Sequence, residues 1–252
     1  MAFNKPFHRN VRGLKKGPNS GFSSWAYIVD REYAKDAEHY VRAFLMIQDD
    51  LKALFEYIEP SDECRSAFSY RIHALFMRAC IEMEANFKAI FEENLFKPKG
   101  RLTMADYRKI DATHHLSSYE VLLPTWSPYP TVFKPFEAWK QQQGLPWYAA
   151  YNDSKHDRHE QFKKANLENL VGAVAGLLAV ISSQFRSEDF SAGSTMLSTG
   201  DGNFYPMESA MGSLFRIKYP EDWSEDEIYD FNWSELQKES DRYAKIDYNQ
   251  IP

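Results

Sequence analysis

The densest group of polar and titratable side chains in the chain lies in residues 147–159. On a helix, Asn152, Lys155, His156 and His159 share one face, because side chains three, four and seven positions apart point the same way. Histidine is suited to proton transfer near neutral pH, and a neighbouring cation is suited to binding a phosphate oxygen. The segment therefore predicts chemistry on a phosphate. The alternative interpretation is a solvated helix surface, with Asn152 or His156 bonded to a neighbouring helix.

Helices are expected to carry this segment, because apolar residues recur at three- and four-residue spacing over most of the first 185 positions. Pro60 ends the first helix, and the short loop that follows makes the first two helices antiparallel neighbours. Pro146 suits the first position of the polar helix. The last helix is apolar nearly all round in its second half, which places that half in the core. We expect helices over residues 30–58, 61–95, 103–116, 147–158 and 160–185.

Two other stretches have a different pattern. Residues 121–146 are rich in proline and aromatic side chains, and we interpret them as an ordered loop with one helical turn that folds over the helices. Residues 213–219 alternate apolar and polar side chains, which predicts a strand. Its expected partner lies in residues 196–207, and residues 224–240 are expected to form a short acidic helix.

The charge of the chain is unevenly distributed. Five basic residues and no acid precede Asp30, whereas residues 186–252 carry 14 acidic and 6 basic side chains. We therefore divide the chain into a basic N-terminal arm, residues 1–29, a helical bundle, residues 30–185, and an acidic C-terminal appendage, residues 186–252. The arm is expected to be solvated and loose, the alternative being an arm that contacts phosphates. The fold class predicted is mainly α: an antiparallel helical bundle with a small α+β or irregular C-terminal appendage.

Composition limits the classes of function. A chain of 252 residues with 44% hydrophobic residues can build a sizeable core, and a net charge of −6 argues against broad nonspecific binding to nucleic acid. Cys64 and Cys80 are too far apart along the expected second helix for a disulfide, which fits a reducing cytoplasm. The chain shows no signal-peptide pattern and no apolar stretch long enough to span a bilayer. Metal-ligand and phosphate-loop motifs are missing, so no metal and no cofactor are expected.

The segment Tyr151-Asn-Asp-Ser-Lys-His-Asp-Arg158 and the long Ala/Leu-rich helix after it resemble the polar motif and last helix of the HEPN superfamily. Residues 78–90 are similar in style to the early helices of such domains. The resemblance covers residues 30–185 by element order and implies a helical fold that commonly dimerises. Many members are metal-independent ribonucleases that use an Arg and a His four to six positions apart, often with Asn directly after the Arg.

Matched residue by residue, Asn152 stands at the Asn of that motif and His156 at its His. Tyr151 stands where the nuclease pattern has Arg, and a tyrosine supplies no cation. Lys155 or Arg158 would then have to hold the phosphate, with Asn152 orienting it. Tyr151 and His159 are the expected substrate contacts. A second stretch, Arg108–His114, also has the Arg-to-His spacing, but about one such match is expected by chance.

The leading functional prediction is an RNA- or nucleotide-associated protein of a bacterial defence or toxin system. An active member would cleave RNA without metal, through attack of the 2′-hydroxyl, with His156 as acid or base at a homodimer interface. The competing prediction is a non-catalytic interaction or dimerisation module, with or without a protein partner, in which Tyr151 marks a lost activity. A metal hydrolase is a distant third.

Overall fold

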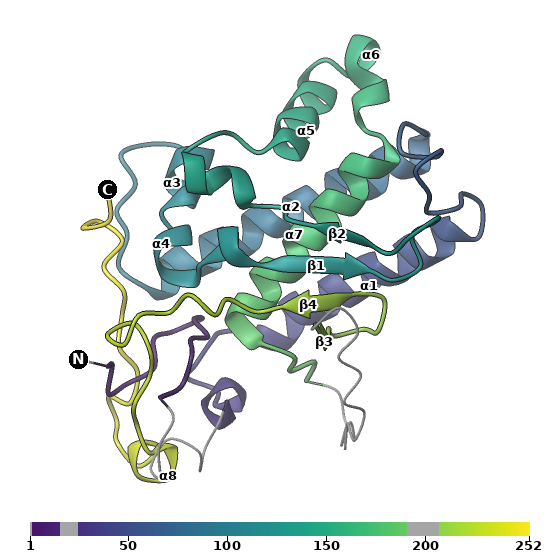
Figure 1. The fold of residues 1–252 in the computed structure, drawn as a ribbon. Helices are drawn as coiled ribbons and strands as arrows, with labels where there is room; N and C mark the ends of the chain where they lie inside the picture. Colours follow the sequence, from purple (N-terminus) through teal and green to yellow (C-terminus); the bar gives the residue numbers. More distant parts are fainter. Residues whose placement is uncertain (1, 16–24, 191–206) are drawn as a thin grey trace.

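The computed structural model describes residues 2–15, 25–190 and 207–252, and this part of the chain is mainly helical with a small antiparallel sheet (Figure 1). The α-helices are α1 (Ala37–Phe55), α2 (Tyr70–Glu93), α3 (Met104–Arg108), α4 (Asp111–His114), α5 (Pro146–His156), α6 (Arg158–Gln161), α7 (Leu167–Phe185) and α8 (Trp233–Leu236). Short 3-10 turns are η1 (Ala26–Val29), η2 (Leu116–Ser118), η3 (Glu137–Gln141) and η4 (Phe162–Lys164).

Helix α7 is the centre of the fold, as its composition predicts. Every residue from Leu170 to Phe185 is buried, and α7 packs against α1, α2 and α5. Among the described residues, α7 is the one helix long and apolar enough to cross a membrane, but 83% of that stretch is buried inside the fold, as in a core helix. The expected start at residue 160 is wrong. The Asn166 side chain caps α7 by accepting a hydrogen bond from the Asn169 N–H at 3.0 Å.

The first two helices also begin later than expected. Helix α1 starts after Asp36, and α2 starts after Ser69, whose hydroxyl accepts from the Ile72 N–H at 3.2 Å. The residues before α2 hydrogen-bond to distant segments instead: the Asp62 N–H donates to the Ser127 carbonyl, and the Leu167 N–H donates to the Ala67 carbonyl. These tertiary hydrogen bonds replace those of the expected helical turns. They also bring the segment before α2 beside the start of α7.

Helices α2 and α7 run in the same direction. Their starts meet at the bridge between Phe68 and Asn166, and their ends meet around Arg9, which contacts both Glu93 and Gln184. The antiparallel relation expected throughout the bundle therefore does not hold for this pair.

The sheet combines the middle and the C-terminal part of the chain. Its order is β2 (Thr131–Phe133), β1 (Glu120–Leu123), β4 (Arg216–Lys218) and β3 (Glu208–Ser209), all antiparallel. Strand β4 confirms the strand expected in residues 213–219. The proline-rich stretch, expected as a loop with one helical turn, also supplies β1 and β2 besides η3. Most of the expected partner strand, residues 196–206, lies outside the described residues. The expected acidic helix over 224–240 is reduced to α8.

The N-terminal segment is packed into the core, so the expectation of a loose arm is wrong for residues 2–15. Its buried side chains are Phe7, Arg9, Asn10, Val11 and Arg12. The phenol of Tyr229 links this segment to the C-terminal part, because it donates to the Asn10 carbonyl at 3.0 Å and accepts from the Phe7 N–H at 3.0 Å. Arg9 and Arg12 are turned away from solvent, so they do not supply the phosphate contacts of the alternative interpretation. Residues from all three predicted parts contribute to one hydrophobic core.

Arg9 is the strongest attachment of this segment. Its Nε donates to Glu93 Oε1 at 2.5 Å, one Nη donates to Gln184 Oε1 at 2.9 Å, and the other donates to the Lys35 carbonyl. The guanidinium also lies 4.6 Å from the ring centroid of Tyr40. A buried charge is tolerated when its donors are satisfied in this way. The Arg9 carbonyl in turn lies 2.9 Å from Nε2 of His114.

Replacing Arg9 by Ala is expected to lower the free energy of unfolding by about 3–5 kcal/mol, because the largely buried Glu93 would lose its charged partner and, among the described residues, keep only the Lys35 N–H. Urea denaturation followed by circular dichroism measures the change. Lys5→Ala is the control: its ion pairs with Glu239 and Asp241 lie at the surface, so its loss should be much smaller. Similar losses in the two variants would show that the guanidinium does not hold the segment in place.

The buried imidazole of His114 should make the free energy of unfolding depend on pH. Burial lowers the pKa of His114 from 6.5 to about 3. Between these two pH values His114 is protonated in the unfolded chain but neutral in the folded chain. The free energy of unfolding therefore falls by about 1.4 kcal/mol per pH unit as the pH drops from 6.5 towards 3. His114→Gln removes this contribution. The variant should be less stable than wild type near neutral pH, and the difference should shrink as the pH is lowered to about 5.

Denaturation with urea at several pH values tests this expectation. His39→Gln, at an exposed position of α1, is the matched control for replacing a histidine outside the core. A difference between His114→Gln and wild type that does not change with pH would contradict the assignment of a buried neutral imidazole.

Candidate functional site

The polar segment forms a corner between two helices. Helix α5 begins with Pro146 at its first turn, as predicted, but it ends at His156, two residues before the expected end. Asp157 has non-helical backbone angles and starts α6, where its carboxylate accepts from the Glu160 N–H at 3.4 Å. The break places His159 on α6, so the predicted face of four side chains does not continue as far as His159. Figure 1 shows α5 and α6 near the starting end of α7.

Asn152 and His156 do lie together, as the sequence predicts. They line one hollow of about 280 Å³ together with Asp153, Asp157, Gln161 and Lys164. Asn152 is half-buried and His156 is exposed. Within the described ranges, neither side chain makes a hydrogen bond to another residue, so the amide and the imidazole are both available to a ligand. This smaller hollow is the part of the candidate site that the helix spacing predicted.

Tyr151 does not contact this hollow. Its side chain is fully buried between α5 and α2, with its ring 6.3 Å from that of Phe76. Lys155 is exposed, and its Nζ donates to the Tyr151 hydroxyl at 3.1 Å. Burial raises the pKa of Tyr151, so the phenol stays neutral. Tyr151 is a packing residue, and its expected role in substrate binding does not fit this arrangement. Lys155 does not line the hollow, and its expected role in holding phosphate stays a prediction.

Arg158 and His159 are exposed on α6, and neither lines the hollow. The cation that does line it is Lys164, which the helix pattern missed because η4 turns the chain back towards α5. Nζ of Lys164 lies 2.7 Å from Oδ2 of Asp153, and the two side chains are 44% and 45% exposed. The smaller hollow therefore combines an imidazole, a carboxamide, a carboxylate from Asp157 and an exposed ion pair.

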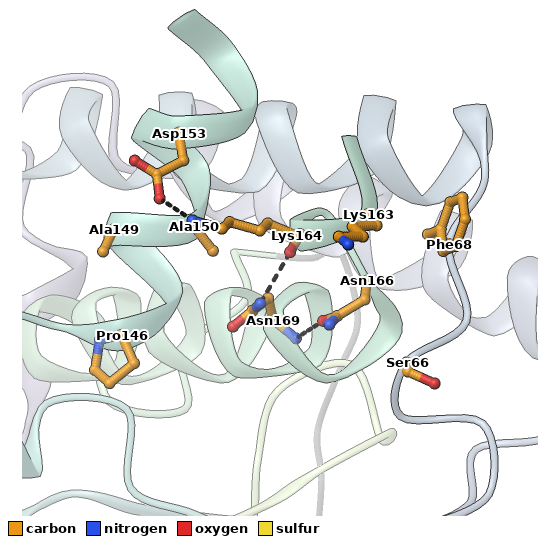
Figure 2. Close-up of a pocket in the computed structure, with 10 residues that line it drawn as sticks. All are labelled: Ser66, Phe68, Pro146, Ala149, Ala150, Asp153, Lys163, Lys164, Asn166 and Asn169. Carbon is orange, nitrogen blue, oxygen red and sulfur yellow. Dashed lines mark hydrogen bonds and ion pairs between the residues drawn. The ribbon is translucent and has the colours of Figure 1, made fainter. Parts of the chain in front are cut away.

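A larger hollow of about 590 Å³ adjoins the first and shares Asp153 and Lys164 with it. Figure 2 shows the residues that line it: Ser66, Phe68, Pro146, Ala149, Ala150, Asp153, Lys163, Lys164, Asn166 and Asn169. They come from α5, from the turn before α7, from α7 itself and from the segment before α2. No periodic pattern relates these segments, which explains why the sequence did not predict this hollow.

The other candidate groups do not form sites. His114 is buried against Arg9 and Thr113, and Arg108 donates to the Gln142 carbonyl at 3.0 Å, so the second Arg-to-His match is coincidental. In the described part of the chain, no group of three or more His, Cys, Asp and Glu side chains is arranged to hold a metal ion. Both cysteines are free, and burial raises the pKa of the Cys80 thiol, which fits a packing role.

The site thus consists of two adjoining hollows joined by the Asp153–Lys164 ion pair. Comparison of the chain with protein-family models, with curated proteins and with solved structures finds no match.

Proposed function

We propose that this chain is an RNA- or nucleotide-associated protein of HEPN type that binds a strand at the corner of α5 and α6. The observation that carries the proposal is the pair formed by Asn152 and His156, which are accessible and without other partners in the same hollow. A carboxamide and an imidazole bind phosphate and sugar oxygens through hydrogen bonds. Lysines and an exposed phenylalanine line the adjoining hollow, where they can contact the phosphates and the bases of a strand.

The helical arrangement of that family is part of the proposal. Helix α2 packs against α1, α5 and α7, and α5 also packs against α7. We therefore take these four helices as the bundle, with α5 presenting its polar outer face to the ligand.

Binding without cleavage is the activity that the charges favour. Cleavage of RNA needs a proton acceptor, which His156 can provide, and positive charge to stabilise the pentacoordinate phosphate. Asp153 and Asp157 face the same hollow as His156, and its lysine is already paired with Asp153. The position at which the nuclease motif has Arg is the buried Tyr151. A cleavage centre here would need a further cation, for which the homodimer expected of the family is the natural source.

The direct test measures binding of a fluorescent single-stranded RNA of mixed sequence by anisotropy, with EDTA present. Wild type should bind, and Asn152→Ala combined with His156→Ala should weaken binding by about fivefold to thirtyfold, for two hydrogen bonds of about 1 kcal/mol each. His159→Ala is the matched control, because His159 is exposed nearby but does not line the hollow. Its affinity should equal that of wild type.

A denaturing gel of the same mixtures distinguishes the two hypotheses for the site, RNA binding alone and RNA cleavage. We expect no cleavage beyond that seen with His156→Ala. Cleavage by wild type that His156→Ala abolishes would instead establish the ribonuclease. Absence of RNA binding by wild type, with self-association in sedimentation, would reject the proposal in favour of the interaction module.

A further inference from the structure

Two side-chain amides line the larger hollow, and within the described part of the chain each keeps one polar atom without a hydrogen-bond partner. Asn166 uses its Oδ1 to accept from the Asn169 N–H, which leaves its Nδ2 for a ligand. Asn169 uses its Nδ2 to donate to the Lys164 carbonyl at 2.9 Å, which leaves its Oδ1. The two amides are therefore oriented by the backbone around them. A donor and an acceptor in one hollow can pair with the acceptors and donors on the edge of a nucleobase.

An aromatic surface borders the same hollow. Phe68 lines it and is 52% exposed, although an apolar ring of this size is usually buried. Phe162 supports it edge-on, with ring centroids 5.9 Å apart, and Tyr70 extends the surface beyond Phe162 at 4.9 Å. Tyr70 is 73% exposed. An exposed ring held by a second ring can stack on a base.

Two lysines supply the positive charge. Figure 2 shows Lys163 and Lys164 at the middle of the hollow, between α5 and Phe68. Within the part of the chain that the structure describes, Lys163 has no ion pair, and Lys164 is paired with Asp153. That pair is nearly half exposed, and exposed pairs of this kind are weak. A phosphate can therefore replace the Asp153 carboxylate at Lys164 at little cost.

We propose that the larger hollow binds one nucleotide. The base lies against Phe68 and hydrogen-bonds to the amides of Asn166 and Asn169, and the phosphate binds Lys163 and Lys164 in place of Asp153. The volume of about 590 Å³ is in the usual range for a small-molecule site. That this nucleotide belongs to a strand continuing into the smaller hollow rests on the proposed function. The nucleotide site itself rests on the residues of the larger hollow.

Calorimetric titration of the full chain with each of the four ribonucleoside 5′-monophosphates tests the site. The decisive variant is Asp153→Asn, which should bind about threefold to tenfold more tightly than wild type, because the competing carboxylate and its repulsion of phosphate are gone. A variant that merely damaged the fold would not gain affinity. Asp49→Asn removes a comparable exposed ion pair, with Lys52 on α1, and should leave affinity unchanged.

Two further variants should lose affinity. Lys163→Ala should bind about threefold to tenfold more weakly, with a smaller dependence on salt, because one phosphate contact is gone. Phe68→Ala should bind at least about fivefold more weakly, because base stacking is lost. Lys99→Ala and Tyr129→Ala remove an exposed lysine and an exposed tyrosine away from the hollow and serve as controls.

The outcomes separate this inference from the proposed function. Monophosphate binding that responds to these substitutions supports the nucleotide site, even if longer RNA does not bind. RNA binding that depends on Asn152 and His156 but not on Phe68 or Lys163, without monophosphate binding, would overturn the nucleotide site and leave the proposed function standing. Binding of inorganic phosphate as tight as that of the monophosphates would also overturn it, since the base would then contribute nothing.

Discussion

The buried guanidinium of Arg9 is the interaction on which the arrangement of the helices depends. It reaches the end of α2 through Glu93, the end of α7 through Gln184 and the approach to α1 through the Lys35 carbonyl. A charge removed from water in this way must keep all its partners, so the three elements are held in one geometry. The segment that carries Arg9 precedes α1 in the sequence. It packs against the C-terminal ends of α2 and α7, at the opposite end of these helices from the candidate site.

Arg9 joins the C-terminal ends of α2 and α7, and the candidate site lies at their N-terminal ends. Because both helices run in the same direction, their starts lie together, joined by the bridge between Phe68 and Asn166. The corner of α5 and α6 stands at this end, and the turn before α7 brings Lys163 and Lys164 beside α5. Rigid helices thus position short irregular segments, an arrangement in which binding residues are commonly found.

The local sequence pattern predicted a considerable part of this structure. It predicted α7 as the central helix, Pro146 as the start of α5, the strand around Ile217 and the proximity of Asn152 to His156. All of these depend on contacts within one element or on the burial of a whole segment. The spacing of apolar and polar residues along the sequence indicates both.

The features that were missed depend on contacts between distant segments. Residues 61–68 have the pattern of a helix, but they hydrogen-bond to Ser127 and to the start of α7 instead. The sequence pattern of the N-terminal segment indicates a solvated arm, because the partners of Arg9, Glu93 and Gln184, are far away in sequence. The larger hollow was missed for the same reason, since Phe68, Lys163 and Asn169 belong to separate elements.

Tyr151 explains why the cations of the site must come from outside α5. Position 151 faces α2, where the neighbouring Tyr148 hydroxyl donates to Glu84 at 3.0 Å and the Tyr151 ring packs on Phe76. An arginine at 151 would enter this interface, and not the hollow that Asn152 and His156 line. The residues of α5 that do face the hollow, Asn152, Asp153 and His156, include a carboxylate and no lysine or arginine. Within the described residues, the lysine that lines it is Lys164, from the turn before α7. The Asp153 carboxylate pairs with this lysine, so any anionic ligand at this face would have to compete with Asp153 for it.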